Sequence, residues 1–184
     1  TPRQPQPCPE GNYCPPGTGL SLPQCPIGTI STAIMLASAD ECQDCPPSKY
    51  CDSLGATTHA GDCGAGYFCV GANVDATGAT RADSCALAAS TPCTAGHYCL
   101  LGAAAELPCE KGTYSDTANL QSAGACTDCP EGSACATGST THTPCAPGTY
   151  TDSENQWECA PCTGGTYQDG VGETACKACV AGSY

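Results

Sequence analysis

The chain has 184 residues, of which 20 are cysteine, and a formal net charge of −13 at pH 7. Leu, Ile, Val and Phe together supply about 9% of the residues, which excludes an ordinary hydrophobic core because so little apolar surface cannot offset chain entropy. The five basic residues are scattered, which argues against nucleic acid and anionic membranes as partners. A cysteine content of about 11% instead predicts a scaffold held by disulfides outside the reducing cytosol.

The chain begins with a Pro-rich stretch, residues 1–7, which has no apolar run of the signal-peptide type. The longest apolar patches, Ile34-Met35-Leu36 and Leu100-Leu101, are too short to span a bilayer. We therefore expect residues 1–7 to be a linker, and the chain to be a processed or excised part of a secreted protein with no direct membrane insertion.

From Cys8 onward, the phrase Cys-x-x-Gly-x-aromatic recurs along the chain, at intervals of mostly 16 to 20 residues. Ten copies define ten repeats, numbered here in chain order, which begin at Cys8, Cys25, Cys45, Cys63, Cys93, Cys109, Cys129, Cys145, Cys162 and Cys179. Ser48 replaces the glycine in repeat 3, and Ala134 replaces the aromatic residue in repeat 7. The phrase predicts a less secure turn and less ring packing in those two repeats.

Two kinds of repeat alternate with some irregularity. In the first kind a second cysteine follows the aromatic position at once, as in Cys8 to Cys14. In the second kind the chain runs on to a Cys-x-x-Cys pair, whose second cysteine opens the next repeat. This organisation predicts cysteine-rich repeats over residues 8–62, an irregular repeat with an insertion over 63–92, and cysteine-rich repeats over 93–184, of which the last is truncated.

Each position of the phrase has a physical reason. Glycine supplies the positive φ of a tight turn, and the aromatic ring two residues later can lie over a neighbouring disulfide as a small core. We expect small disulfide-rich repeats in an elongated tandem array of short β-hairpins and turns. Little helix is expected beyond single turns within Ser31–Ala39 or Ala118–Ala123, because no stretch keeps a 3.6-residue apolar period.

The phrases Cys109-Glu-Lys-Gly-Thr-Tyr-Ser115 and Cys126-Thr-Asp-Cys129-Pro-Glu-Gly132 resemble the ephrin-receptor-like and growth-factor-receptor cysteine-rich repeats. These are similar in style to EGF-like and TNF-receptor-like modules, and the resemblance covers Cys8 to Tyr184. Such repeats occur in receptor ectodomains and, as long tandem arrays, in large surface proteins of protists and algae, including flagellar hair (mastigoneme) proteins. The resemblance implies an extracellular or cell-surface location and a role without catalysis.

A tandem register in which each repeat closes on itself gives nine proposed disulfides. Those of the first kind are Cys8–Cys14, Cys45–Cys51, Cys63–Cys69, Cys93–Cys99 and Cys129–Cys135. Those of the second kind are Cys25–Cys42, Cys109–Cys126, Cys145–Cys159 and Cys162–Cys176. Cys85 remains, and its partner is open between another chain and Cys63 or Cys69. Cys179 also remains, and we expect its partner beyond Tyr184.

A zinc site is the main chemical alternative to the disulfides. Cys159-x-x-Cys162 and Cys176-x-x-Cys179 approach the spacing of a four-cysteine zinc ribbon. Cys162 and Cys179 also open repeats, however, and the same spacing continues the array. We therefore expect disulfides here, with no metal and no cofactor.

Candidate catalytic residues are few. His59, His97 and His142 are the only imidazoles, and none accompanies a nucleophile elbow or paired carboxylates, so we expect exposed loop histidines. Asp40-Glu41, Asp44 and residues 152–154 do not follow the pattern of a calcium loop and are expected to be solvated, weak calcium binding being the alternative.

The remaining signals concern the surface. Trp157 is expected to cover the disulfide of its own repeat, the alternative being a contact anchor for a partner. The sequence has no Asn-x-Ser/Thr sequon, so sugars on a glycoprotein of this kind would be O-linked, with the tract Thr137 to Thr143 as the candidate.

Two functions follow from these expectations. The first is a semi-rigid, disulfide-stapled spacer or assembly segment of a large extracellular filament or cell-surface protein, a flagellar hair being one example. Its partners would be other protein chains of that assembly, including copies of itself. The alternative is a ligand-binding ectodomain of a cell-surface receptor. An accessory domain of an enzyme has no feature in its favour.

Overall fold

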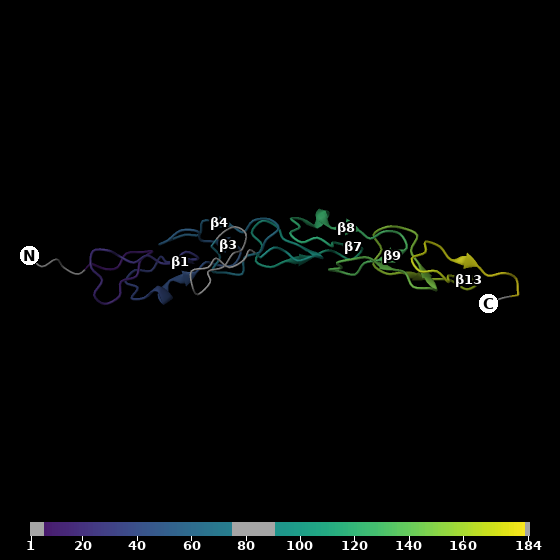
Figure 1. Ribbon diagram of the computed structural model, residues 1–184, viewed down its shortest axis with the longest axis horizontal. Helices are drawn as coiled ribbons and strands as arrows, with labels where there is room; N and C mark the ends of the chain where they lie inside the picture. The colour runs from purple at the N-terminus through teal and green to yellow at the C-terminus, as the bar shows by residue number, and fades with distance from the viewer. Residues whose placement is uncertain (1–5, 75–90, 183–184) are drawn as a thin grey trace, which may run out of the picture. The chain divides into compact units, whose positions relative to one another are not determined.

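The computed structural model of the protein describes residues 6–74 and 91–182, which fall into two compact units (Figure 1). Unit 1 consists of Thr1–Pro92 and Leu100–Ala105, and unit 2 of Cys93–Cys99 and Glu106–Tyr184. Cys85 lies outside the described residues, as does most of the predicted insertion.

Two-residue strands and single turns of 3-10 helix make up the secondary structure of the described residues. In the first part of the chain these are β1 (Thr29–Ile30), η1 (Ala39–Glu41), β2 (Gln43–Asp44), β3 (Lys49–Tyr50) and β4 (Gly61–Asp62). In the second they are β5 (His97–Tyr98), β6 (Leu107–Pro108), β7 (Thr113–Tyr114), η2 (Ala123–Ala125), β8 (Thr127–Asp128), β9 (Ser133–Ala134), β10 (Thr143–Pro144), β11 (Thr149–Tyr150), β12 (Ala160–Pro161), β13 (Thr166–Tyr167) and β14 (Lys177–Ala178). Consecutive strands pair antiparallel into two-stranded hairpins. The predicted fold class, small disulfide-rich repeats of short hairpins with little helix, is confirmed.

A tight turn opens each repeat. In repeat 6 the N–H of Thr113 donates to the carbonyl of Glu110 at 3.0 Å, and Gly112 between them has φ +88°, which is the geometry of a type II turn. Ser48 adopts φ +69° at the same position of repeat 3, and its turn leads into a paired strand. The weaker turn predicted for repeat 3 is therefore wrong, because the hydrogen bonds around Ser48 hold a left-handed conformation that serine otherwise avoids.

The two helical turns lie later than the sequence suggested. η1 and η2 begin where the segments Ser31–Ala39 and Ala118–Ala123 end, directly before a cysteine of the second kind of repeat. A left-handed residue, Met35 in one segment and Asn119 in the other, prevents a right-handed helix from starting earlier.

At six junctions of the described residues, four backbone hydrogen bonds join a repeat to the next, and we call these and their equivalents elsewhere the junction bonds. Between repeats 6 and 7, Cys129 N–H donates to Gly112 C=O and Gly112 N–H donates to Cys135 C=O, both at 2.8 Å. In the same junction, Gly138 N–H donates to Cys109 C=O at 2.9 Å. The fourth bond runs from Ser115 N–H to Ser139 C=O at 3.0 Å. The same four bonds join repeats 1 and 2, 2 and 3, 3 and 4, 5 and 6, and 7 and 8.

One donor of the junction bonds is always a left-handed residue, nine or ten positions after the cysteine that opens its repeat. In the described part of the chain these residues are Met35, Gly55, Ala72, Gly102, Asn119, Gly138, Asn155 and Gly172. The conformation turns the N–H back toward the preceding repeat, and only half of the positions are glycine. The hydrogen bond thus offsets the cost of positive φ at the others.

The glycine of the phrase also approaches the repeat after next. A Cβ atom placed on Gly11, Gly96 or Gly132 would overlap the carbonyl oxygen of Gly55, Gly138 or Gly172, respectively, two repeats further on. Gly148, with φ +86°, has no atom within 4 Å of such a Cβ. Glycine is therefore required at the first three positions for close backbone approach as well as for φ.

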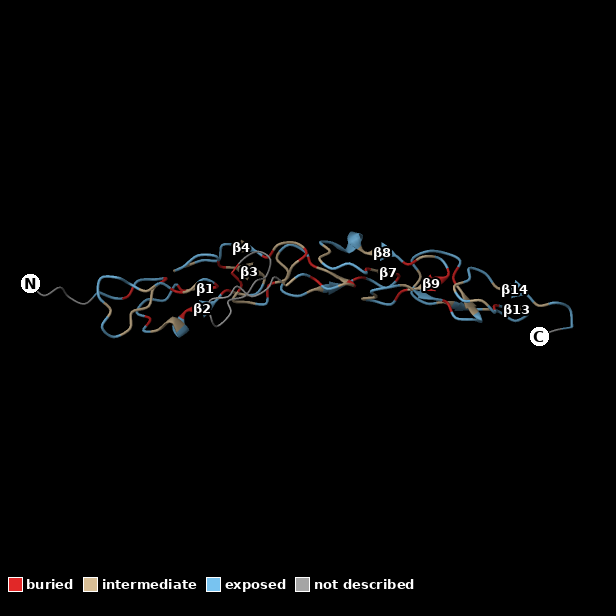
Figure 2. Ribbon diagram, in the orientation of Figure 1, coloured by how far each residue is buried: buried red, intermediate tan, exposed pale blue. Residues whose placement is uncertain are grey.

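The buried residues form short separate stretches along the chain, most of them at cysteines (Figure 2). In repeats 1 to 8 at least one cysteine of each disulfide is buried, and the sulfur pair serves as a small core. In one such cluster Leu36 joins Cys25 and Cys42, and Tyr13 of the preceding repeat packs against it. Ring and disulfide together replace the aliphatic core that the composition excludes.

Candidate functional site

The cysteines are the residues that define this molecule chemically. The structure brings together the two members of each of the nine pairs named from the register, with Cα–Cα distances of 5.7 to 6.0 Å. Among the described residues Cys179 is a free, half-buried thiol. Cys63 and Cys69 are bonded to each other, so neither of them is the partner of Cys85.

Disulfides of the first kind join cysteines six positions apart and close a small ring around the turn and one strand. In repeat 3 the bond joins Cys45 to Cys51, which directly follows β3. Both cysteines are almost completely buried, at 1% and 0% exposure. The returning strand, β4, lies outside the ring.

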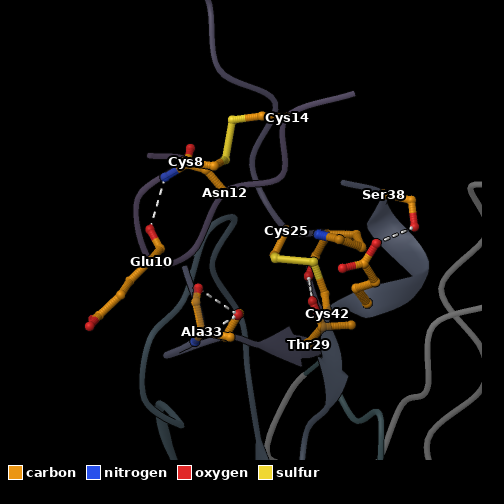
Figure 3. The surroundings of a disulfide bond; sticks show 12 residues. Cys8, Glu10, Asn12, Cys14, Cys25, Thr29, Ala33, Ser38 and Cys42 are labelled. Carbon is orange, nitrogen blue, oxygen red and sulfur yellow. Dashed lines mark hydrogen bonds between the residues drawn. A yellow bond between two sulfur atoms is a disulfide. The ribbon is translucent and has the colours of Figure 1, made fainter. Parts of the chain in front are cut away.

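Disulfides of the second kind join cysteines 14 or 17 positions apart, and the ring includes the turn, the first strand and the loop after it. In repeat 6 Cys109 bonds to Cys126, and Cys126 directly precedes the returning strand β8. Figure 3 shows the equivalent bond of repeat 2, where Cys42 lies beside Cys25 at the end of the 3-10 turn. The bond therefore ties the two strands of the hairpin together.

Repeats of the second kind carry a buried polar residue where the first kind has its second cysteine. These residues are Ser31, Ser115, Thr151 and Gln168, with 2 to 5% exposure. The Ser115 hydroxyl accepts the N–H of Thr117 at 3.2 Å, and Gln168 Oε1 accepts the N–H of Gly170 at 2.9 Å. A side-chain hydrogen bond thus replaces the disulfide at this position. Sequence reasoning missed this role, although the shared position in the phrase was a usable signal.

The cysteines considered for zinc lie in separate bonds. Cys159 is bonded to Cys145 and Cys162 to Cys176, which leaves Cys179 as the one thiol of that set. Within residues 6–74 and 91–182, no group of three or more His, Cys, Asp or Glu residues is placed to hold a metal ion.

Two histidines contact other residues instead of lying free in loops. His97 lies in β5, with Nδ1 3.3 Å from the Thr94 hydroxyl. His142 has Nδ1 3.1 Å from the Ser133 hydroxyl, and its ring meets that of Tyr114 edge-on at 5.6 Å between centroids. The expectation of exposed loop histidines is wrong for these two, because each is part of a hairpin or of a contact between repeats, and it holds for His59.

Trp157 connects two repeats. Its ring is 52% exposed, and Nζ of Lys111 lies 4.5 Å from its centroid. A cation over the face of an indole is attracted by the ring quadrupole, by about 0.5–1 kcal/mol at exposed sites. The residue therefore ties repeat 8 to repeat 6, a longer-range role than the expected cover of its own disulfide.

Two exposed ion pairs brace hairpins. Lys49 and Asp62 are opposite each other on β3 and β4, and Nζ of Lys177 on β14 lies 2.6 Å from a carboxylate oxygen of Asp169. The hydrogen bond from Lys49 lowers the pKa of Asp62, and that from Lys177 lowers the pKa of Asp169. The same bond raises the pKa of Lys177. Exposed pairs of this type contribute little to stability.

The lowered pKa values of Asp62 and Asp169 predict how the two ion pairs respond to acid. Each pair contributes to stability above the ordinary aspartate pKa, and the contribution is lost as the pH falls through the lowered folded-state pKa. A carbon-13 NMR titration of the carboxyl groups is expected to place the midpoints of Asp62 and Asp169 below 3.8, the ordinary value. In Lys49→Met the midpoint of Asp62 should rise while that of Asp169 stays constant. An unchanged Asp62 midpoint would contradict the pairing.

The burial of the disulfides predicts the order in which they are reduced. Cys162 and Cys176 are half-buried, whereas Cys45 and Cys51 are nearly inaccessible. Because exchange requires access of a thiolate to sulfur, limiting reductant should open Cys162–Cys176 well before Cys45–Cys51, by on the order of tenfold in rate. Alkylation of released thiols and peptide mass analysis measure the order, with denaturant as a control that should remove the difference. The same mapping tests the connectivity.

One groove on unit 2 could receive another molecule. It has a volume of about 440 Å³ and is lined by Tyr98, Leu107, Pro108, Glu110, Lys111 and Thr137. Lys111 also contacts the half-exposed Trp157, so aromatic, aliphatic and charged groups lie together. In the described parts of the chain no helix has the length and apolarity needed to cross a bilayer.

Residues 148–184 match a family described as tyrosine-protein kinase ephrin type A/B receptor-like. The matched segment holds most of repeat 8, all of repeat 9 and the start of repeat 10. No curated protein was found to match the chain. The match and the disulfides mark an extracellular, disulfide-stapled, cysteine-rich repeat, which is a non-catalytic type of domain.

Proposed function

We propose that the chain is a semi-rigid spacer or assembly segment of a large extracellular filament or cell-surface protein. The observation that supports this most directly is the set of four junction bonds, which recurs at six junctions of the described residues. An array whose neighbours are joined by identical bonds can be lengthened by adding repeats, and its mechanics follow from the number of copies.

The surface suits such a role. The net charge of −13 keeps the chain soluble. The three cations within the described residues are engaged locally, Lys49 and Lys177 by carboxylates and Lys111 by an indole. The partners we propose are other protein chains of the same assembly, including copies of this one. A flagellar hair is one filament that this proposal covers.

Immunogold labelling of intact, unpermeabilised cells of the source organism tests the proposal. We expect label along surface filaments or in a regular coat, and chemical cross-linking in situ should join copies of the chain to each other. Label confined to the cell interior would overturn it.

A receptor ectodomain is the second candidate, and the groove at Tyr98 and Leu107 together with the ephrin-receptor-like match supports it. In this case the purified chain should bind saturably to intact cells. Leu107→Ser and Trp157→Ala should weaken that binding about tenfold or more, because exposed aromatic and aliphatic anchors dominate such contacts. Leu54→Ser, at an exposed position in unit 1, is the matched control.

A further inference from the structure

The two kinds of disulfide protect their hairpins differently. In a repeat of the second kind the cysteine bond lies next to both strands, as Cys109–Cys126 does beside β7 and β8. In a repeat of the first kind the bond ends at the first strand, as Cys45–Cys51 does at β3, and the cysteine after β4, Cys63, is bonded within the next repeat, so no disulfide joins β3 to β4. The described hairpins divide cleanly. The bond spans the hairpin at β1–β2, β7–β8, β11–β12 and β13–β14, and does not span it at β3–β4, β5–β6 and β9–β10.

We propose that the chain is an extensible tether with a built-in limit, in which tension opens the hairpins of the first kind while those of the second kind stay closed. The proposal rests on the proposed function as a spacer segment of an extracellular assembly, and it adds that this segment carries tension. It assigns a mechanical role to the pattern of the two kinds of repeat.

Only non-covalent contacts oppose the opening of a hairpin of the first kind. Between β3 and β4 these are strand hydrogen bonds, the bond from Ala60 N–H to Tyr50 C=O, and the exposed pair of Lys49 and Asp62. Extension of residues 52–62 also breaks three junction bonds, from Gly55 N–H to Cys25 C=O, from Ser31 N–H to Ala56 C=O and from Cys63 N–H to Ser48 C=O. Each contributes modestly, on the order of 1 kcal/mol or less, so the hairpin can open and close reversibly.

The chain released by opening is set by the positions of the cysteines. In repeat 3 eleven residues lie between Cys51 and the next opening cysteine, Cys63, and this stretch can extend to roughly 4 nm. In repeat 6 only two residues lie between Cys126 and the next opening cysteine, Cys129, and they extend to roughly 1 nm. The residues enclosed by a disulfide ring carry no tension, so they add nothing to the extension while the bond is intact.

Single-molecule stretching of the full oxidised chain, held at its two ends, tests the proposal. Extension is expected in reversible steps and then a stop well short of the full contour length. Adding reductant under tension should release the rings, which hold on the order of 90 residues of chain and add roughly 25–30 nm. Oxidised chain that does not extend before reduction, or that reaches the same length without it, overturns the proposal.

A converted repeat sharpens the test. In the double variant Cys51→Ser, Ala60→Cys the second cysteine moves to the place that it has in the second kind of repeat, three residues before Cys63. The number of disulfides is unchanged, yet about nine residues join the ring, so the oxidised extension should shorten by roughly 3 nm. The reduced variant should match the reduced native chain. An oxidised extension that does not shorten, with the new bond verified by peptide mapping, contradicts the proposal.

A second conversion, Cys135→Ser with His142→Cys, provides the same comparison in unit 2, with an expected loss of about 2.5 nm. The native measurement decides the question if neither variant folds. The outcome is separable from the proposed function, since a chain that is found away from surface filaments can still stretch in steps, and a filament component can fail to do so.

Discussion

Full reduction at neutral pH, without denaturant, is expected to unfold the chain completely. Apart from cysteine, the only large apolar side chains buried among the described residues are Leu36 and Val74. A disulfide typically contributes 2–4 kcal/mol, and a folded domain has a net stability of only about 5–15 kcal/mol. The loss of several such bonds therefore exceeds any stability that the remaining contacts can supply.

Amide proton NMR of the chain before and after dithiothreitol measures this result. We expect the dispersed amide signals of the oxidised chain to collapse into the narrow range of an unfolded chain. Alkylating reagent added without reductant is the control and should leave the dispersion intact. Dispersed signals that survive with every thiol alkylated would show that another source of stability holds the fold.

The second large effect is expected from Gly132→Ala. Gly132 has φ +73°, and a Cβ atom there would overlap the backbone carbonyl of Gly172, which cannot move aside as a flexible side chain could. The positive φ costs about 1–2 kcal/mol and the overlap about 1–3 kcal/mol more. We expect local destabilisation of about 2–5 kcal/mol around repeats 7 to 9.

Gly148→Ala is the matched control for this variant. Its φ of +86° imposes the same conformational cost, but no atom lies within 4 Å of the added Cβ. Hydrogen exchange of the Cys145 and Gly172 amides reports the difference, since both take part in junction bonds. Protection should fall roughly 30-fold or more for Gly132→Ala and about 5- to 30-fold in the neighbouring junction for Gly148→Ala, with the larger loss for Gly132→Ala. Equal losses would show that close backbone approach does not explain the glycine.

The fold class could be predicted from the sequence because cysteine content and the recurring phrase leave few alternatives. The turn and hairpin of each repeat are local, so Cys-x-x-Gly-x-aromatic is enough to place them. The conformation of Ser48 was not accessible in this way. The bonds that hold it come from Cys69 and Cys63 in the next repeat, and a local pattern does not record them.

Of the candidate site, too, only the features that lie within one repeat could be predicted from the sequence. Cysteine pairs follow from the tandem register because each bond closes within one repeat. The buried Ser115, the contact of His142 with Tyr114 and that of Lys111 with Trp157 were not foreseen. The two contacts link different repeats, and their spacing in the sequence depends on how repeats stack.

The positions of the junction bonds also show where the repeat sequence can best tolerate insertions. In every repeat with a described left-handed residue, these bonds use only the first ten or so residues, ending with the one after it, for example Ser139 in repeat 7. The stretch from there to the next opening cysteine varies from about six residues to about 20, the longest lying before Cys93. A small tag inserted directly after Ser139, before the His142 that contacts Tyr114, should therefore leave the four junction bonds between repeats 6 and 7 in place.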